Sequence, residues 1–166
     1  MLSSHELFGF MSPTLAQDIL NHAYADDREL YKATLQAVAQ VKHVRPAFLQ
    51  QQSRVLRHKA MAETLARPVL ELAAANMLRG WLLKQQTAVL VDFLDALGIP
   101  HENGAVEDLP AGMEDDKLKA AVEALLAKHP HEIVAVYLHA FNAMNAANWP
   151  NLNAMLETEG RLQLGA

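Results

Sequence analysis

The balance between helix-forming and strand-forming residues constrains the fold of this chain most strongly. Its 166 residues include 28 alanines and 26 leucines, against only 11 valines, 5 threonines and 3 isoleucines. Alanine and leucine lose little conformational freedom in a helix, whereas β-branched residues favour the pleated surface of a sheet. The sequence therefore predicts an all-α fold.

Prolines and glycines indicate where the helices begin and end, because proline tolerates the first helical turn and glycine the position after the last. Ser12, directly before Pro13, is for example a typical N-cap residue of a helix. Seven longer helices are predicted over residues 13–25, 26–45, 46–65, 69–83, 89–97, 114–128 and 130–145, followed by a short one over residues 150–156. We expect an irregular bundle of about seven helices, and the length of the chain favours a single domain over residues 1–166.

The segment Val69–Leu83 is apolar on nearly every side of the predicted helix. A helix of this kind needs neighbours around most of its circumference, so we expect it to be the most buried helix of the bundle. Gly80 interrupts it at a cost of about 1 kcal/mol relative to alanine. The glycine therefore predicts a close helix crossing at that position.

One long irregular segment is predicted near residues 98–113. It contains Pro100, Gly104, Pro110 and Gly112, which are incompatible with a regular helix, and it is acidic. Long loops of this kind in compact domains are often functional. We therefore expect this acidic loop to contribute to function.

The chain has no cysteine, which excludes disulfides, thiolate nucleophiles and iron–sulfur ligation. Its first residues lack the basic and apolar regions of a secretory signal. A membrane span needs about 18 consecutive apolar residues without charges, and the sequence contains no such window. These features predict a cytoplasmic protein with no membrane partner.

His129, His131 and Glu132 form the densest group of candidate metal ligands. Helical metal sites usually place histidines three or four residues apart, and this group lacks that spacing. The preferred interpretation is that these histidines lie at a junction between helices, where cationic side chains favour the carbonyl end. We expect neither a bound metal nor a cofactor, and no motif assigns a catalytic residue.

Asparagines are concentrated around a tryptophan near the C-terminus, and Asn145, Asn148 and Trp149 are the candidates for a polar ligand pocket there. Asparagine also favours caps and turns, because its amide bonds to nearby backbone groups. A helix–turn–helix junction is therefore the preferred interpretation.

Charge is distributed unevenly, with a net charge of +6 over residues 41–84 in a chain whose total is −5. The helical period places Arg54, Arg57 and His58 on the solvent side, as a candidate interaction surface. We expect the basic residues to face acidic residues from Gln85 onward, within one chain or across a homodimer. Nucleic-acid binding is the less favoured alternative because the whole chain is acidic.

These observations favour a non-enzymatic protein-interaction or assembly module, which binds a partner protein or a second copy of itself. One alternative is a small-molecule-binding helical enzyme with a histidine and carboxylate site between helices. Another is a weak nucleic-acid binder that uses residues 41–84.

Overall fold

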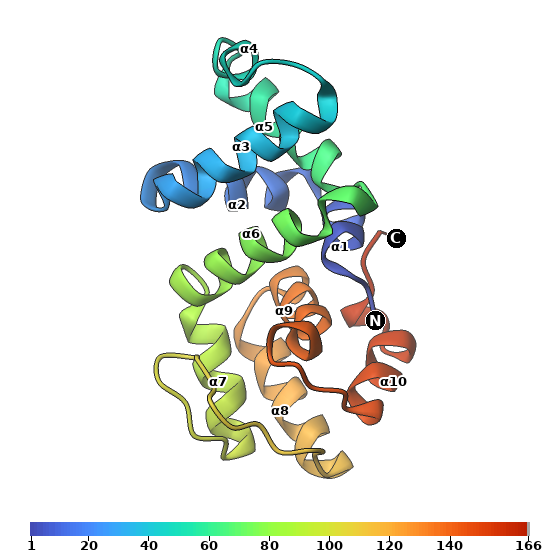
Figure 1. The fold of residues 1–166 in the computed structure, drawn as a ribbon. Helices are drawn as coiled ribbons and strands as arrows, with labels where there is room; N and C mark the ends of the chain where they lie inside the picture. Colours follow the sequence, from blue (N-terminus) through green and yellow to red (C-terminus); the bar gives the residue numbers. More distant parts are fainter. Residues whose placement is uncertain (166) are drawn as a thin grey trace. The chain divides into compact units, whose positions relative to one another are not determined.

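The computed structural model describes residues 1–165 and confirms the all-α prediction. Over these residues it contains ten α-helices, two short 3-10 helices and no β-strand (Figure 1). The α-helices are α1 (Ser4–Phe10), α2 (Pro13–Asp26), α3 (Arg28–Lys42), α4 (Pro46–Gln50), α5 (Arg54–Leu65), α6 (Glu71–Lys84), α7 (Thr87–Leu97), α8 (Asp115–Lys128), α9 (His131–Met144) and α10 (Pro150–Thr158). The 3-10 helices are η1 (Pro68–Leu70) and η2 (Gly160–Leu162). No helix within the described range is long and apolar enough to cross a membrane.

The first helix, α1, was not predicted from the sequence, although its capping signal is present there. Glu6 lies three residues after Ser3, and its carboxylate accepts a hydrogen bond from the Ser3 backbone N–H at 3.2 Å. The Glu71 carboxylate of α6 accepts two more, from the N–H groups of Ser4 at 2.7 Å and His5 at 2.9 Å. These bonds satisfy N–H groups that have no partner within the helix, so they stabilise even this short helix.

The segment predicted as one helix over residues 46–65 is two helices, α4 and α5, separated at residues 51–53. Ser53 caps the second helix, because its Oγ accepts a hydrogen bond from the backbone N–H of Leu56 at 3.4 Å. The break changes which residues share a face. An assignment based on one continuous helical period therefore misplaces residues of α5.

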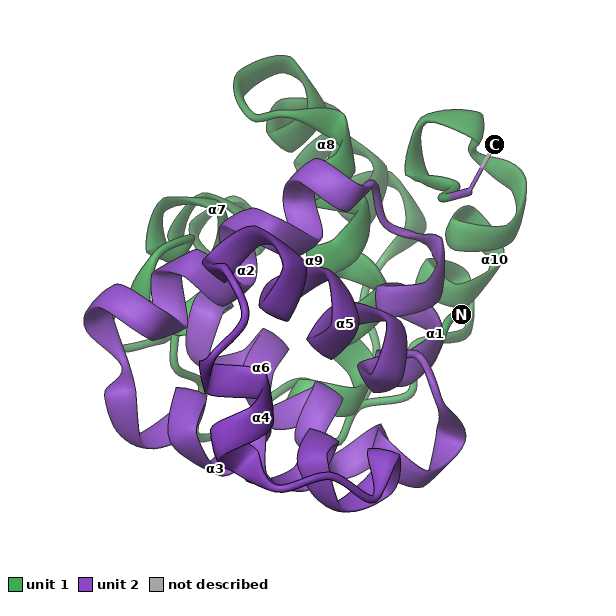
Figure 2. Cartoon of the chain, turned by 90° about the horizontal axis from the view of Figure 1, so that it is seen from above, with its two compact units in different colours: residues 1–2, 82–164, 166 green, residues 3–81, 165 purple. Residues whose placement is uncertain are grey.

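The chain divides into two compact units, which Figure 2 shows in different colours. The N-terminal unit comprises residues 3–81 and Gly165, and the C-terminal unit comprises residues 1–2 and 82–164. The prediction of one domain over residues 1–166 stays a prediction.

In the N-terminal unit, α2, α3 and α5 pack against one another, α1 packs on α5, and α4 packs on α3. The shared core is aliphatic and includes Ile19, Leu35, Val38, Met61 and Leu65, each at most 2% exposed. This packing fixes the relative positions of α1, α2 and α5, which line the groove described below.

The prediction that Val69–Leu83 forms the most buried helix is wrong. Val69 and Leu72 are 71% and 74% exposed. The buried residues of α6 follow one helical face: Ala74, Met77, Leu78, Trp81 and Leu82. Helix α9 is buried more completely, because residues 134–142 are all buried. Apolar composition did not distinguish a helix covered on one face from one enclosed on all sides.

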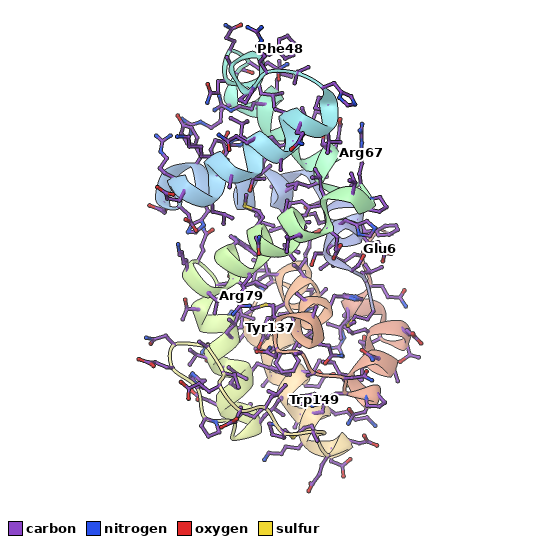
Figure 3. The ribbon with its side chains drawn as sticks, viewed as in Figure 1. Glu6, Phe48, Arg67, Arg79, Tyr137 and Trp149 are labelled. Carbon is purple, nitrogen blue, oxygen red and sulfur yellow. The ribbon has the colours of Figure 1, made fainter. Side chains whose placement is uncertain are left out.

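The C-terminal unit is built around α9, which packs against α7, α8, α10 and η2. Its core contains a chain of aromatic contacts between Phe93, Tyr137, Phe141 and Trp149, with neighbouring ring centroids 5.0–5.9 Å apart. Figure 3 labels Tyr137 and Trp149 within this unit. Several of these pairs meet edge to face, the arrangement that the quadrupoles of aromatic rings favour.

The irregular segment predicted near residues 98–113 is confirmed, since no helix occurs between α7 and α8. Local hydrogen bonds order part of it. The His101 ring bonds to Asp95 at 2.7 Å and accepts from the Gly104 backbone N–H at 3.1 Å, and the backbones of Glu102 and Ala105 bond reciprocally. A functional role for this loop stays a prediction.

The atoms nearest to Gly80 belong to side chains, so the close helix crossing predicted there stays a prediction, but their close approach carries a prediction about stability. A Cβ atom at this position would lie 2.7 Å from Cδ2 of Leu30 and 3.4 Å from Oδ2 of Asp27. We expect Gly80→Val to lower the free energy of unfolding by about 1–3 kcal/mol, because the larger side chain overpacks this contact. Urea denaturation measures the change.

The matched control is Gly112→Val, since a Cβ at Gly112 meets no atom within 4 Å. This variant should change the free energy of unfolding by no more than about 0.5 kcal/mol. Equal stabilities for the two variants would contradict the close approach at Gly80.

Candidate functional site

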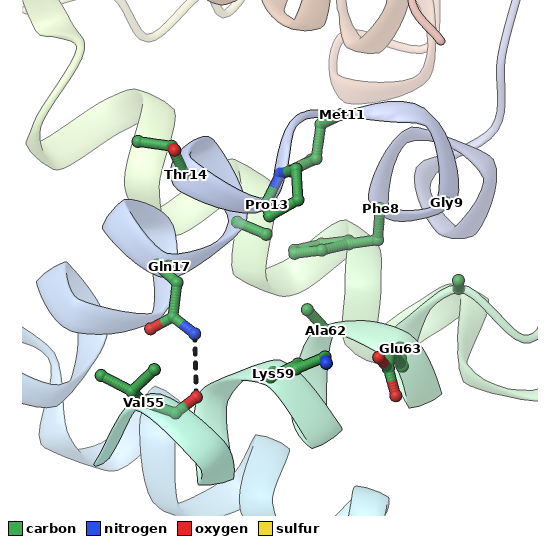
Figure 4. Close-up of a pocket in the computed structure, with 12 residues that line it drawn as sticks. Phe8, Gly9, Met11, Pro13, Thr14, Gln17, Val55, Lys59, Ala62 and Glu63 are labelled. Carbon is green, nitrogen blue, oxygen red and sulfur yellow. Dashed lines mark hydrogen bonds between the residues drawn. The ribbon is translucent and has the colours of Figure 1, made fainter.

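A groove of about 690 Å³ lies between α1, α2 and α5 in the N-terminal unit (Figure 4). Most of its lining is apolar or small. The lining residues are Phe8, Gly9, Met11, Pro13, Thr14, Ala16, Gln17, Val55, Lys59, Ala62, Glu63 and Ala66. A cavity of this size and character is typical of a binding site.

Small residues on all three helices create the groove. Gly9 of α1, Ala16 of α2, Ala62 of α5 and Ala66 directly after α5 leave the space between the helices unfilled. The approach of α1 to α5 is close, because a Cβ at Gly9 would lie 3.6 Å from the Cβ of Ala66. The groove therefore follows from packing within one unit.

One hydrogen bond ties two walls of the groove together. Gln17 Nε2 of α2 donates to the backbone oxygen of Val55 at the start of α5, at 2.9 Å (Figure 4). The side chain of Val55 remains 66% exposed. A bond between the walls holds the spacing of α2 and α5, so a ligand meets a site that is already formed.

Two opposite charges, Lys59 and Glu63, lie one turn apart on α5 beside the apolar lining. Both side chains are exposed, and within residues 1–165 neither has an ion-pair partner. The groove thus combines an apolar surface with one free cation and one free anion. This combination suits the binding of an amphipathic partner.

The structure corrects the orientation predicted for Arg54, Arg57 and His58. Arg54 is exposed, but Arg57 is only 8% exposed and His58 is fully buried. The outward orientation predicted for Arg57 and His58 is therefore wrong. The cause is the break before α5, which rotates these residues toward α2 and α3.

His58 lies in a hydrogen-bonded chain that explains its burial. Its Nδ1 is 3.0 Å from Oδ1 of Asn21, and its Nε2 is 2.8 Å from the hydroxyl of Tyr31. Burial, and then the positive charges of Arg57 and Arg54, lower the pKa of His58 to about 4. The neutral ring therefore donates to Asn21 and accepts from Tyr31, which satisfies both ring nitrogens.

Three arginines surround Tyr24 of α2. The guanidinium carbons of Arg28 and Arg54 each lie 4.4 Å from the ring centroid, and that of Arg57 lies 5.5 Å away. The positive charge of Arg28, followed by that of Arg54, lowers the pKa of the Tyr24 hydroxyl. Sequence reasoning missed this cluster because its members come from three separate helices, and even Tyr24 and Arg28, four residues apart, belong to α2 and α3.

His129, His131 and Glu132 lie at the junction between α8 and α9. His129 caps the end of α8, and its Nε2 is 2.7 Å from Oδ2 of Asp92, which Lys128 Nζ also approaches at 3.0 Å. The hydrogen bond from His129 lowers the pKa of Asp92. Among the described residues no three histidine or carboxylate side chains converge as metal ligands.

Asn145, Asn148 and Trp149 lie at the turn before α10. The Trp149 ring is fully buried, and its Nε1 donates to the backbone oxygen of Pro110 at 3.0 Å. Asn145 donates to the backbone oxygen of Phe141 at 3.0 Å, and Oδ1 of Asn148 accepts from Asn153 at 3.2 Å. These contacts are those of a helix–turn–helix junction, and a ligand pocket beside Trp149 stays a prediction.

No protein-family model, curated protein or solved structure matches this chain. The feature of the described residues that bears most on function is therefore the groove itself.

Proposed function

We propose that this protein is a non-enzymatic interaction module that binds an amphipathic α-helix of a partner protein in the groove between α1, α2 and α5. The observation that carries the proposal is the groove itself, about 690 Å³ with a largely apolar lining. Amphipathic helices bind proteins by placing their apolar face into such grooves, with anchors at positions i, i+3, i+4 and i+7.

Exposed apolar side chains extend the surface beyond the groove. Phe10, Val55 and Leu56 are 49%, 66% and 60% exposed, and they lie on the same two helices, α1 and α5, that line it. Large apolar side chains exposed on the helices that form a groove favour an interaction site there. An elongated partner segment buries this surface together with the groove, whereas a compact ligand covers the groove alone.

The charges of Lys59 and Glu63 define the expected partner further. A helix with an acidic and a basic residue about one turn apart, beside its apolar stripe, pairs with both. Such pairs at the rim of an interface contribute mainly to orientation and association rate, while the apolar anchors supply most of the affinity. The expected partner is therefore an amphipathic helix of mixed charge.

Site-specific photo-cross-linking in cells tests this proposal. A photoreactive phenylalanine analogue at Val55, which is exposed in the groove, should form an adduct with one segment of a partner protein. That segment should show apolar residues at helical spacing. The matched control places the same analogue at Ala33, an exposed residue of α3 that does not line the groove.

Three other outcomes of the cross-linking experiment would each overturn the proposal. Adducts between two copies of this chain would show that the groove takes part in self-association and does not bind a different protein. Adducts with lipid alone would identify an acyl-chain site. The same adducts at Val55 and Ala33, or none at Val55, would remove the groove as a binding site.

A further inference from the structure

A second cavity in the N-terminal unit lies on a different side of α5 and has a different chemistry. It measures about 330 Å³, and its lining contains three cationic residues and no acidic residue. The lining residues are Tyr24, Arg28, Tyr31, Lys32, Leu35, Gln50 and Arg57. Of these, none lines the apolar groove.

Arg57 is the most informative residue of this cavity. Its side chain is only 8% exposed, yet no carboxylate in the described structure pairs with it. Nη1 donates to the backbone oxygen of Gln50 at 3.2 Å, whereas the buried Nε has no hydrogen-bond partner. Because Nε is itself buried, a ligand in the cavity does not reach it and meets the rest of the guanidinium instead. A largely buried guanidinium without a carboxylate partner is costly, so its retention beside a cavity that has no acidic residue points to an anionic ligand.

The neighbouring groups hold Arg57 in place. Its guanidinium carbon lies 5.5 Å from the ring centroid of Tyr24 and 5.9 Å from that of Tyr31. The Tyr31 ring is itself fixed by the hydrogen bond between its hydroxyl and His58. The guanidinium of Arg57 therefore lies beside two aromatic rings, one of which is bonded to the buried His58.

Charge repulsion gives a second reason to expect a ligand. Arg28 and Lys32 are one turn apart on α3, both are exposed, and neither has an ion-pair partner among residues 1–165. Together with Arg57 they place three like charges around one small cavity. An anion with two negative charges relieves this repulsion better than a single carboxylate does.

We propose that this cavity binds a small phosphorylated molecule, with its phosphate dianion held by Arg57, Arg28 and Lys32. The planar guanidinium groups match the oxygens of a phosphate, and Lys32 adds a point charge. The volume of about 330 Å³ limits the ligand to a phosphate with a small organic group. This site is independent of the groove and does not rest on the function proposed for it.

Isothermal titration calorimetry of the full chain tests this inference, at one low and one moderate salt concentration and with the same ionic strength for all probes at each. The probes are inorganic phosphate, glycerol phosphate and a single-stranded DNA oligonucleotide. We expect phosphate and glycerol phosphate to bind to one site. Arg28→Gln and Arg57→Gln should each weaken this binding by roughly 10- to 100-fold, as the loss of a charged hydrogen-bond donor does.

The matched control is Arg67→Gln. Arg67 is an exposed arginine beyond the end of α5 and lines none of this cavity (Figure 3). Arg28 is also exposed, so its variant tests the site even if the substitution of buried Arg57 prevents folding. Phosphate binding that is unchanged in Arg28→Gln, or weakened equally by Arg67→Gln, overturns the inference.

The oligonucleotide distinguishes a small ligand from a nucleic-acid backbone. For a small phosphorylated ligand, the oligonucleotide should bind no more tightly than glycerol phosphate. Tight binding of the oligonucleotide that falls steeply with added salt, with weak binding of the small phosphates, would overturn the inference in favour of a polyanion surface.

Discussion

Replacing Phe141 with alanine is expected to lower the free energy of unfolding by about 3–5 kcal/mol, the range of large aromatic deletions in protein cores. The Phe141 ring is fully buried and contacts three other aromatic rings, Phe93 at 5.3 Å, Tyr137 at 5.9 Å and Trp149 at 5.0 Å between centroids. The cavity left by the deletion is surrounded by rigid rings that cannot easily collapse into it. We therefore expect a value in the upper part of this range.

Urea denaturation of the wild type and the variant measures this effect. Phe48→Ala is the matched control, because Phe48 on α4 is 53% exposed (Figure 3) and its loss leaves no enclosed cavity. The control should cost no more than about 1 kcal/mol. If both variants unfold at the same urea concentration, Phe141 does not lie at the centre of an aromatic core.

The second large effect concerns the dependence of stability on pH. The pKa of His58 is lowered from an ordinary value of 6.5 to about 4 in the folded protein, by burial and by the charges of Arg57 and Arg54. The unfolded state therefore binds more protons than the folded state between these two values. Stability falls as the pH is lowered from about 6.5 to 4, with a loss from this group of at most roughly 3 kcal/mol.

Denaturation at a series of pH values tests this expectation. His58→Gln should reduce the fall in the free energy of unfolding between pH 6.5 and 4, because the titrating group is removed. Burial also lowers the pKa of His139, so part of the pH dependence should remain. His131→Gln, at an exposed histidine, is the control and should leave the full dependence. Identical pH profiles for the two variants would contradict a buried neutral His58.

The fold class and most helix positions follow from the sequence, because they depend on local preferences. Pro13 and Pro150 open α2 and α10, and Gly98 ends α7 in the left-handed conformation. The helix count was too low for local reasons as well. The capping signals of Ser3 with Glu6 before α1 and of Ser53 before α5 are short, and apolar periodicity does not reveal them.

Burial depends on tertiary packing and was harder to predict. The apolar residues Val69 and Leu72 are exposed, whereas the polar His58 is fully buried. Composition gave no reason to expect either result. His58 is accommodated only because Asn21 and Tyr31, from two other helices, satisfy both of its nitrogens.

Neither candidate site was identified from the sequence, and the reason is the same for both. The groove is defined by small residues such as Gly9, Ala16 and Ala62, which suit a helix interior as well as a binding surface. The cationic cavity combines residues of α2, α3 and α5 that lie far apart along the chain. The sequence did indicate a basic segment over residues 41–84, and Arg57 belongs to it.

The central claim is that the groove of α1, α2 and α5 binds an amphipathic helix of a partner. The most direct measurement is the affinity of a synthetic peptide, covering the segment cross-linked at Val55, for three forms of the protein. In Ala62→Trp a large ring fills the groove, and in Ala33→Trp the same ring lies on an exposed face of α3. We predict that Ala62→Trp weakens peptide binding by about 100-fold or more, as the loss of a central apolar anchor does, while Ala33→Trp leaves it unchanged. Equal affinities for the wild type and Ala62→Trp would contradict the claim.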